Sequence, residues 1–474
     1  MHVLFVTSEV AGVFKIGGLA DVSQALPVAL GRQGISVTVT LPFYKTIDVS
    51  GVSGVGELAV NFAGKREIVF IFSKPMGVDG VTLLLFRHPK LNDYFGHPIE
   101  ETFAFYNAVI STFYLYSSHL LSSPVDIVHC HDWHTSLVPL LVGESNKVFD
   151  KKETIQSKNV RTIITIHNLL YQGVAQDSII EDLNAPRELF HIRTFHGAKK
   201  ISFLRESLEC ADQITTVSPT YAREITAQPR KDSIGDVLVR RRARTVGVLN
   251  GIDLTLWDPK TDIALPEHYD ATSVKLVKSR LKSHLQRELG LPQESLPLFG
   301  FVGRIEPRQK GIDIVMEALK DLIDTVGFQV VLLGTGDPQS VHELMTLARK
   351  HKKYIAFIHA FDDGLARRIY AGSDCLLVPS KFEPCGLTQM IAMRYGTVPL
   401  VRNTGGLADS VVDGKTGLVF EAYSGHALAA AIQRAINLWT NKKGQWENLI
   451  RNGMAQDFSW DRSAKRYMTL YRSL

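Results

Sequence analysis

The sequence predicts an α/β protein built from two doubly wound sheets. Three observations support this fold class. The chain has 474 residues, which exceeds what one ordinary hydrophobic core organises. Short apolar runs alternate with helical patterns in both halves. The composition, 45% hydrophobic and 21% charged residues, is normal for a globular protein with a large buried core.

The first half opens with a buried strand over 2–9, a helix over 18–34 and a strand over 36–42. A strand–helix–strand unit of this kind favours a parallel sheet. Further strands are predicted as a meander over 56–64, 66–73 and 81–88. Three more are expected to end in polar residues, over 124–132, 160–168 and 211–219.

A second α/β cycle is expected to begin near "RARTVGVLNGID". Its strands are predicted over 297–305, 327–336, 354–360 and 374–380, and its helices over 311–326 and 339–351. The last stretch reads as an amphipathic helix with Trp460, Tyr467 and Tyr471 for packing. We predict an N-terminal domain over 1–243, a C-terminal domain over 244–455, and a terminal helix over 456–474 that returns to the first domain.

In doubly wound sheets, ligands bind beyond the carboxyl ends of the strands. We therefore expect the two sheets to face one another across a cleft that holds the active site.

The charge, the length of the apolar runs and the cysteine spacing exclude several classes of protein and of site. The net charge of +5 is slight and no long basic run occurs, so no nucleic-acid partner is predicted. No apolar run reaches the roughly 20 residues that a membrane helix needs, and the N-terminus reads as a strand. Cys130, Cys210, Cys375 and Cys385 lack metal-ligand spacing. They fit free thiols in a reducing cytoplasm.

The letters "GGLAD" occur twice, in "KIGGLADV" and in "NTGGLADSV". The first copy follows a strand and opens a helix, with Lys15 beside it. Glycines let a backbone approach a phosphate closely, and a helix N-terminus favours an anion. The segment matches neither GxGxxG nor the P-loop. From the residues alone, a phosphate loop and a structural turn both stay open.

Polar clusters end two neighbouring strands. "VHCHDWHTS" carries His129, His131, Asp132 and His134, which predict a lining for a polar ligand. Metal binding is the weaker alternative, because neither cysteine nor glutamate completes a cage. At least one of these histidines is expected to be structural. "TIHNLLYQG" carries His167 and Asn168, which can meet a ligand hydroxyl or cap a loop.

Two segments of the second half suggest an anion site. In "GRIEPRQKGID", Arg304 and Lys310 can converge on a diphosphate, although an ordinary exposed loop is the alternative. In "PSKFEPCGLTQM", Glu383 precedes a glycine and a helix start. Free amides near Leu387 and Thr388 would hold a phosphate, while Glu383 could meet a sugar.

These segments together resemble the glycogen and starch synthases of glycosyltransferase family five, which use ADP-glucose. The resemblance runs from "FVTSEVAGVFKIGGLADV" to the last helix. It implies a GT-B fold, meaning two Rossmann-like domains around a cleft. It further implies retaining transfer of glucose to the non-reducing end of an α-1,4-glucan, with release of ADP. No cofactor or metal is implied, and the oligomeric state stays open.

The resemblance assigns roles in the first domain. Lys15 with Gly17 and Gly18 matches a loop that meets the donor phosphates and the transferred glucose. Three further residues match positions that line the sugar and acceptor region: Asp21, Asp132 and His167. Asn168, next to His167, is also predicted to bind substrate.

In the second domain, Arg304 and Lys310 match the cations that neutralise the departing diphosphate, although this chain has one residue more between them. Arg308 could share the role of Lys310. Glu383 matches a glutamate that contacts the glucose, and Phe361 stands where a tyrosine stacking near the adenine is common. The remaining substrate-binding positions are Asn250, Cys385, Gly386, Leu387, Thr388, Gly405 and Gly406.

The residues also allow other functions. The chain could be another GT-B glycosyltransferase, using UDP-glucose or a different nucleotide sugar, because the sequence does not spell out the base. It could also bind a sugar nucleotide without catalysis. A phosphorylase using pyridoxal phosphate shares the two-domain plan, but no matching lysine motif is evident. The sequence nominates no carboxylate nucleophile.

Overall fold

The computed structural model describes residues 1–96, 98–116, 120–121, 123–145, 160–195 and 197–474. The chain divides into two units by its internal contacts. Unit 1 comprises Met1–Leu249 and Trp460–Leu474, and unit 2 comprises Asn250–Ser459.

Unit 1 begins with the predicted strand–helix–strand motif. β1 (His2–Val6) is fully buried, α1 (Gly18–Arg32) follows it, and β2 (Ser36–Pro42) pairs with β1 in parallel. A continuous apolar strand of this kind is typical of a parallel sheet that is covered on both faces. The prediction of a parallel arrangement here is confirmed.

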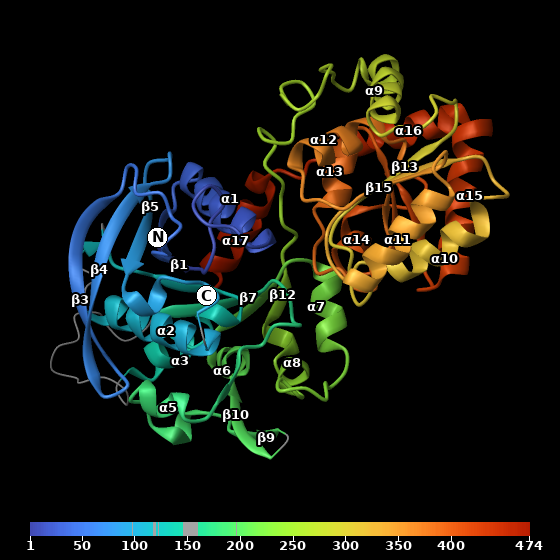
Figure 1. Cartoon of the computed structure of the whole chain (residues 1–474). Coiled ribbons are helices and arrows are strands. Elements are labelled where there is room, and N and C mark those ends of the chain that lie inside the picture. Colours follow the sequence, from blue (N-terminus) through green and yellow to red (C-terminus); the bar gives the residue numbers. More distant parts are fainter. Residues whose placement is uncertain (97, 117–119, 122, 146–159, 196) are drawn as a thin grey trace. The chain divides into compact units, whose positions relative to one another are not determined.

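Within the described residues, unit 1 holds a nine-stranded sheet in the order β12-β11-β7-β6-β1-β2-β5-β4-β3. The predicted meander is confirmed, since β4 pairs antiparallel with both β3 and β5 (Figure 1). The strands not yet bounded are β3 (Ser53–Phe62), β4 (Lys65–Pro75), β5 (Val81–Arg87), β6 (Ile127–His131), β7 (Arg161–Ile166), β11 (Gln213–Thr216) and β12 (Thr245–Gly247).

A small antiparallel sheet of unit 1 contains β8 (Val174–Gln176), β10 (Ala198–Ser202) and β9 (Arg193–Phe195). The other helices of the unit are α2 (Ile99–Tyr116), α3 (Val138–Gly143), α5 (Ile179–Asp182), α6 (Phe203–Cys210), α7 (Pro219–Thr226) and α8 (Val237–Arg240), with the 3₁₀ helices η1 (Pro89–Leu91), η3 (Trp133–Thr135), η4 (Arg187–Leu189) and η5 (Arg242–Arg244).

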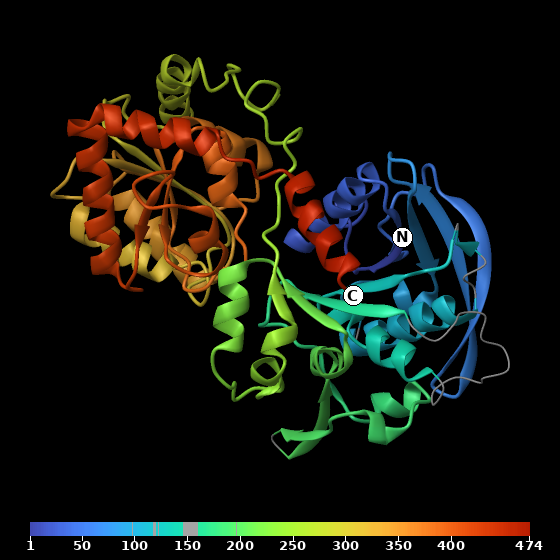
Figure 2. The ribbon, with the colours of Figure 1, turned by 180° about the vertical axis from the view of Figure 1, so that it is seen from behind.

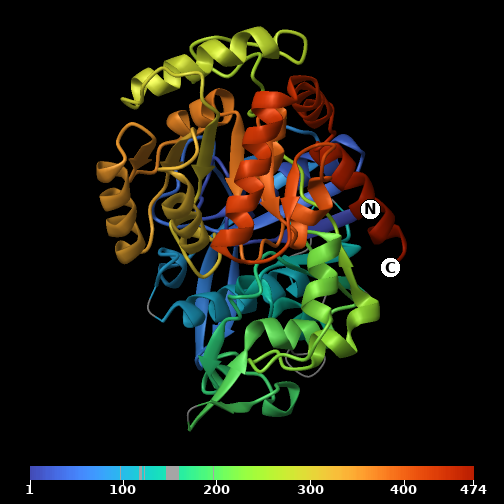
Figure 3. The same cartoon turned by 90° about the vertical axis from the view of Figure 1, so that its right-hand side faces the viewer.

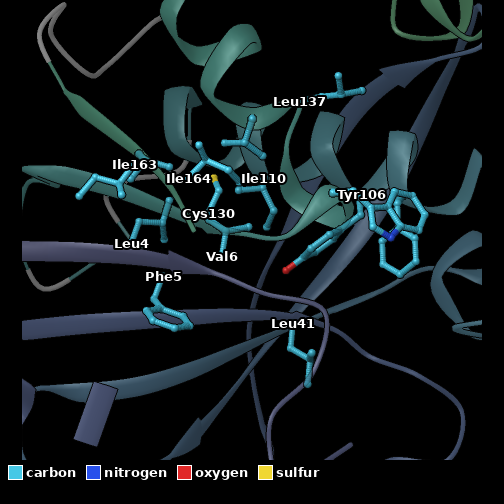
Figure 4. Packing of buried hydrophobic residues seen from close by; sticks show 14 of the residues in the cluster. Leu4, Phe5, Val6, Leu41, Tyr106, Ile110, Cys130, Leu137, Ile163 and Ile164 are labelled. Atoms are coloured by element: carbon cyan, nitrogen blue, oxygen red, sulfur yellow. The ribbon is translucent and has the colours of Figure 1, made fainter. Parts of the chain in front are cut away.

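The core of unit 1 lies between its large sheet and its helices. Figure 4 shows Leu4 and Val6 of β1 near Cys130 of β6 and Ile164 of β7, with Ile110 of α2 above them. All five side chains are completely excluded from solvent. Burial of such apolar side chains is the main stabilising term of the fold.

The last helix, α17 (Trp460–Arg472), belongs to unit 1 and packs against α1. Both views of the ribbon show the red helix beside the dark blue one (Figures 1 and 2). Trp460, Tyr467 and Tyr471 are buried, as the amphipathic pattern predicted.

Unit 2 holds a six-stranded sheet within the described residues, in the order β15-β14-β13-β16-β17-β18. All its pairs are parallel. The strands are β13 (Leu298–Val302), β14 (Gln329–Leu333), β15 (Ile355–Ile358), β16 (Cys375–Val378), β17 (Val398–Arg402) and β18 (Leu418–Phe420).

Helices surround this second sheet, as the yellow to red segments of Figure 3 show. Those packed around its core or bordering it are α9 (Val274–Glu288), α10 (Ile312–Leu322), α11 (Pro338–Lys350), α12 (Asp363–Gly372), α13 (Thr388–Arg394), α14 (Gly405–Ser410), α15 (Gly425–Asn441) and α16 (Lys443–Met454).

The division between the units differs from the sequence-based boundaries by a few residues. The segment expected to open the second domain contains β12, which pairs with β11 in the sheet of unit 1. Unit 2 also extends to Ser459, and the Ile252 N–H donates to the Phe458 carbonyl at 2.8 Å within it. A three-residue strand carries no periodicity, so only its pairing partner reveals where it belongs.

The described part of the chain contains no helix that combines the length and the apolar character needed to cross a bilayer.

Candidate active site

The loop between β1 and α1 carries the first predicted cluster. The Lys15 ammonium lies 2.7 and 2.9 Å from the two carboxylate oxygens of Asp21, which stands in the first turn of α1. The Lys15 side chain is half exposed. The structure therefore brings the predicted cation and the predicted carboxylate of this loop together as an exposed ion pair.

A residue that the sequence analysis did not nominate holds this loop. Glu9 Oε2 accepts hydrogen bonds from the N–H groups of Ile16 and Gly17, each at 2.6 Å. The signal that could have found Glu9 is its position, a polar residue just beyond the carboxyl end of a buried strand.

The first glycine pair borders open space. The α1 N-cap is Gly17, and no side chain caps it. A Cβ added at Gly18 would meet nothing within 4 Å, and one added at Gly17 would only approach Glu9 at 4.0 Å. Neither glycine has the left-handed backbone that would explain it. Neither steric crowding nor backbone conformation therefore requires glycine at these two positions.

The ends of β6 and β7 form the second cluster. These strands pair in parallel, which brings Asp132 beside His167. Asp132 Oδ1 accepts from the His167 N–H at 2.7 Å and from the Asn168 N–H at 3.4 Å. Asp132 has φ +57°, which is rare outside glycine and costs backbone strain. Burial raises the pKa of its carboxyl to about 7, against the effect of the two amides.

His167 is a neutral imidazole in this site. Burial lowers its pKa to about 3, and its Nε2 lies 2.9 Å from Nδ1 of His131. One imidazole donates and the other accepts in that bond, so each histidine keeps one ring nitrogen for another partner. Asn168 accepts from the Leu170 N–H at 3.1 Å, which is the loop-capping role left open by the sequence.

The other histidines of the "VHCHDWHTS" segment are structural, as was expected of at least one. His129 bonds Tyr471 at 2.8 Å and Thr165 at 2.6 Å, and His134 bonds Tyr94 at 2.8 Å. Burial lowers the pKa of His129 and of His134 to about 3. In the described residues no group of three or more histidine, cysteine, aspartate or glutamate side chains has the arrangement of a metal site.

In unit 2, the structure brings Lys310 to Glu383. The ammonium lies 2.7 Å from Glu383 Oε2, which also accepts from the Ser380 hydroxyl at 2.9 Å. Glu383 is buried, whereas Lys310 is partly exposed. Lys310 therefore lies beside the predicted glutamate, while Arg308 is exposed and donates its N–H to Glu306.

Arg304 follows β13 and is exposed, with one NH2 group donating to Gln309 at 3.0 Å. Within the described part of the chain it forms no ion pair, so its charge stays available to an anion. Phe361 is 90% exposed, far more than an aromatic ring usually is. Asn250 is buried, and its Oδ1 lacks a partner among the described residues.

The segment from Cys385 to Thr388 forms the turn into α13. Cys385 is buried and its thiol pKa is raised to about 12, so it is not a thiolate nucleophile. Gly386 has φ +71°, and a Cβ there would come within 2.5 Å of Gln389. Leu387 is the N-cap of α13 and Thr388 its first residue.

The second glycine pair has a different cause from the first. A Cβ at Gly405 would lie 1.9 Å from the Glu383 carbonyl oxygen, and one at Gly406 would lie 2.1 Å from that of Cys385. The Gly406 N–H also donates to the Glu383 carbonyl at 2.9 Å. These glycines allow the start of α14 to pack directly on the backbone that carries Glu383.

Comparison with known proteins agrees with these motifs. Residues 2–240 match the family described as starch synthase catalytic domain, and residues 284–453 match the glycosyl transferases group 1. The chain is 40% identical to the glycogen synthase of Anaeromyxobacter sp. (strain Fw109-5), over 100% of this chain and 99% of that protein. The chain belongs to the glycogen and starch synthase family.

Other members of the glycogen and starch synthase family match equally fully. The glycogen synthase of Hydrogenovibrio crunogenus is 36% identical over 100% of both chains. The catalytic domain of starch synthase IV from Arabidopsis thaliana, bound to ADP and acarbose, has a TM-score of 0.86 and 29% identity, covering 100% of this chain and 99% of that one. The predicted GT-B fold is thereby confirmed, and the chain is a glycosyltransferase.

Proposed function

We propose that the protein is a glycogen synthase that transfers glucose from ADP-glucose to the non-reducing end of an α-1,4-glucan, with retention of configuration and release of ADP. One observation carries the proposal. The chain aligns from end to end with glycogen synthases at 40% identity. The ADP and acarbose bound to the Arabidopsis relative support a nucleotide donor and a glucan acceptor.

The donor diphosphate is assigned to Arg304 and Lys310. Breaking a glucose–diphosphate bond leaves negative charge on the diphosphate, and preorganised cations stabilise that charge. Arg304 is exposed without a carboxylate partner in the described residues. The Lys310 ammonium donates a hydrogen bond to Glu383 Oε2 at 2.7 Å, and this bond fixes its position before the donor binds. In this proposal the two cations stabilise the leaving diphosphate without a metal ion or another cofactor.

The base and the sugar are assigned to further groups. Phe361 presents an almost fully exposed ring, which suits stacking on the adenine. Glu383 contacts the glucose in this proposal, as do Asn250 and the turn from Cys385 to Thr388, with Gly405 and Gly406 supporting that turn.

Unit 1 supplies Lys15, Gly17 and Gly18 to the donor, with open space at Gly18 for the approach. His167 is neutral, because burial lowers its pKa to about 3, and a neutral imidazole suits a hydrogen bond to a sugar hydroxyl. Asp132 holds the His167 backbone, and with Asn168 and Asp21 it completes the polar lining. Cytoplasmic location is part of the proposal, supported by four free cysteines.

The test is extension of an α-glucan with radiolabelled ADP-glucose. We expect Lys15→Ala and Glu383→Ala to lower kcat/KM by about 10²–10³, the usual cost of removing one charge-stabilising group. Lys320→Ala, an exposed lysine on α10, is the matched control and keeps parental activity. Full activity of Lys15→Ala or Glu383→Ala would contradict the role proposed for that residue in binding the donor or its glucose.

The donor itself is tested by competition. ADP-glucose and UDP-glucose are offered together to the purified protein, and the nucleotide released is measured. We expect ADP to dominate. Predominant release of UDP would instead identify a transferase with another donor.

A further inference from the structure

Glu9 makes an unusual contact in the loop that precedes α1. A single carboxylate oxygen, Oε2, accepts the N–H groups of two consecutive residues, Ile16 and Gly17, each at 2.6 Å. Hydrogen bonds of backbone amides to a carboxylate are short and stronger than neutral ones. The contact fixes the two peptide groups that directly follow Lys15.

The backbone that carries Glu9 is itself fixed. The Thr7 hydroxyl donates to the Glu9 carbonyl at 3.1 Å and lies 2.8 Å from the Ser23 hydroxyl of α1. Val10 and Phe14 exchange backbone hydrogen bonds of 2.9 and 2.8 Å, which close the intervening turn. The chain therefore leaves β1, turns back, and presents the loop to Glu9 in one defined geometry.

The surroundings of Glu9 show what keeps its charge. The side chain is buried, and burial raises its pKa, while the two loop amides and Lys15 lower it and Asp21 raises it. A buried carboxylate stays ionised only when it is paired and hydrogen-bonded. The loop supplies those partners, so the charge of Glu9 and the position of the loop depend on each other.

The loop from Lys15 to Gly18 has little else to fix its conformation. It contains two glycines, the residue type that loses most conformational freedom on ordering. Ile16 is half exposed, Gly18 borders open space, and no side chain caps α1. The Glu9 bonds hold the N–H groups of Ile16 and Gly17 at 2.6 Å, whereas the bond from the Ala20 N–H to the Gly17 carbonyl is 3.4 Å long.

We propose that Glu9 is a positioning residue for donor binding: its carboxylate presets the Lys15–Gly18 loop in the geometry that receives the sugar nucleotide. The inference rests on the function proposed above. Ordering the loop in advance means that the donor does not have to supply the free energy of ordering.

Three substitutions separate position from charge. Glu9→Gln keeps the length and an acceptor oxygen, Glu9→Asp keeps the charge but is one methylene shorter, and Glu9→Ala keeps neither. We expect the KM for ADP-glucose to rise about tenfold for Asp and Ala and about threefold for Gln, with the KM for glucan changed less than twofold. A merely stabilising carboxylate would not single out the donor.

A direct readout is backbone hydrogen exchange in a peptide spanning residues 14–20. We expect exchange at Ile16 and Gly17 to accelerate at least tenfold in Glu9→Asp and Glu9→Ala. The control is Glu206→Gln, which removes a buried carboxylate of unit 1 that binds His191 and does not touch the loop. That variant keeps the parental KM for ADP-glucose and the parental exchange of the loop.

Parental KM for ADP-glucose and parental loop exchange in Glu9→Asp would overturn the inference, as would a Glu9→Gln defect larger than that of Glu9→Asp. If Glu9→Ala does not fold, the comparison of the KM for ADP-glucose between Glu9→Gln and Glu9→Asp decides whether the inference holds. A parent protein that transfers glucose from no sugar nucleotide would refute the proposed function instead, and loop exchange would still decide whether Glu9 holds the loop.

Discussion

At the scale of single residues, the two "GGLAD" segments show that identical letters can have different physical causes. Gly405 has φ +45°, and its α-carbon faces the Glu383 carbonyl so closely that no Cβ fits. Gly18 has neither constraint, since its surroundings are open. The sequence predicted both pairs as substrate-binding positions. In the structure, the second pair approaches the protein's own backbone.

This contrast gives a prediction for Gly405→Ala and Gly18→Ala. Gly405→Ala should lose about 3 kcal/mol or more of unfolding free energy, because it adds a steric clash and a strained backbone. Gly18→Ala should stay within about 1 kcal/mol of the parent and instead raise the KM for ADP-glucose. Urea titrations and donor kinetics measure the two effects. Equal stability of the two variants would contradict the assignment.

At the scale of secondary structure, much of the prediction from sequence is confirmed. Strand β2 occupies the predicted range 36–42, and the meander and the amphipathic last helix are present. The helix α2 was not predicted, because it is buried almost all round and so shows no amphipathic stripe. The small sheet of β8, β9 and β10 was also missed, since two of its strands have only three residues.

The helix α17 is tied to the sheet by a buried polar network. The Tyr471 hydroxyl lies 2.8 Å from His129 Nδ1, His129 Nε2 bonds Thr165 on β7, and Thr165 bonds Thr215 on β11 at 2.5 Å. Buried networks of this kind are costly when one member is removed, since its partner is left unsatisfied.

We therefore predict that Tyr471→Phe lowers the unfolding free energy by about 1–3 kcal/mol. The substitution keeps the ring and removes only the hydroxyl that His129 needs. Lys465→Ala, an exposed position on the same helix, serves as control and should change stability by less than about 0.5 kcal/mol. Thermal and urea unfolding measure both, and an unchanged Tyr471→Phe midpoint would argue against the network.

At the scale of the whole molecule, unit 1 concentrates buried ionisable groups near its candidate site. Burial lowers the pKa of His129, His134 and His167 to about 3, and it also lowers the pKa of His131 well below its usual value. Between about pH 3 and 6.5, His129, His134 and His167 are neutral when folded and protonated when unfolded. Stability must therefore fall as the pH falls through this window.

Asp132 changes the pH dependence of stability in the opposite direction to the histidines. Its pKa is raised to about 7, so between about pH 4 and 7 the folded state holds a proton that the unfolded state has released. Its contribution to stability is present at low pH and is lost as the pH rises toward 7. The histidines outnumber it, so the sum still favours neutral pH.

We predict that two substitutions change the slope of unfolding free energy against pH in opposite directions. Between pH 4 and 6, the parent protein takes up one proton at His134 when it unfolds, and His134→Phe abolishes this uptake. The unfolding free energy of the variant should therefore rise less steeply with pH, by about 1.4 kcal/mol per pH unit. Asp132→Asn should make that rise steeper by a similar amount. Loss of the Tyr94 bond to His134 shifts all values equally and leaves the slope unchanged. Urea titrations across this range measure the slopes, and parallel curves would refute the prediction.

The sequence by itself determined the fold class, most strands and helices, and the placing of reactive residues at strand ends. These follow from hydrophobic periodicity and local turn chemistry, which depend on near neighbours in the chain. Family membership also followed, because several separate motifs matched together.

Only the tertiary structure decided which side chains meet. Lys310 and Glu383 are 73 residues apart, Asp132 and His167 are 35 apart, and Tyr471 lies 342 residues from His129. Such pairs are set by strand order and register, which no local pattern encodes. For the same reason Glu9 passed unnoticed in the sequence: its role depends on a turn that brings the loop back to it, and that turn closes only in the folded chain.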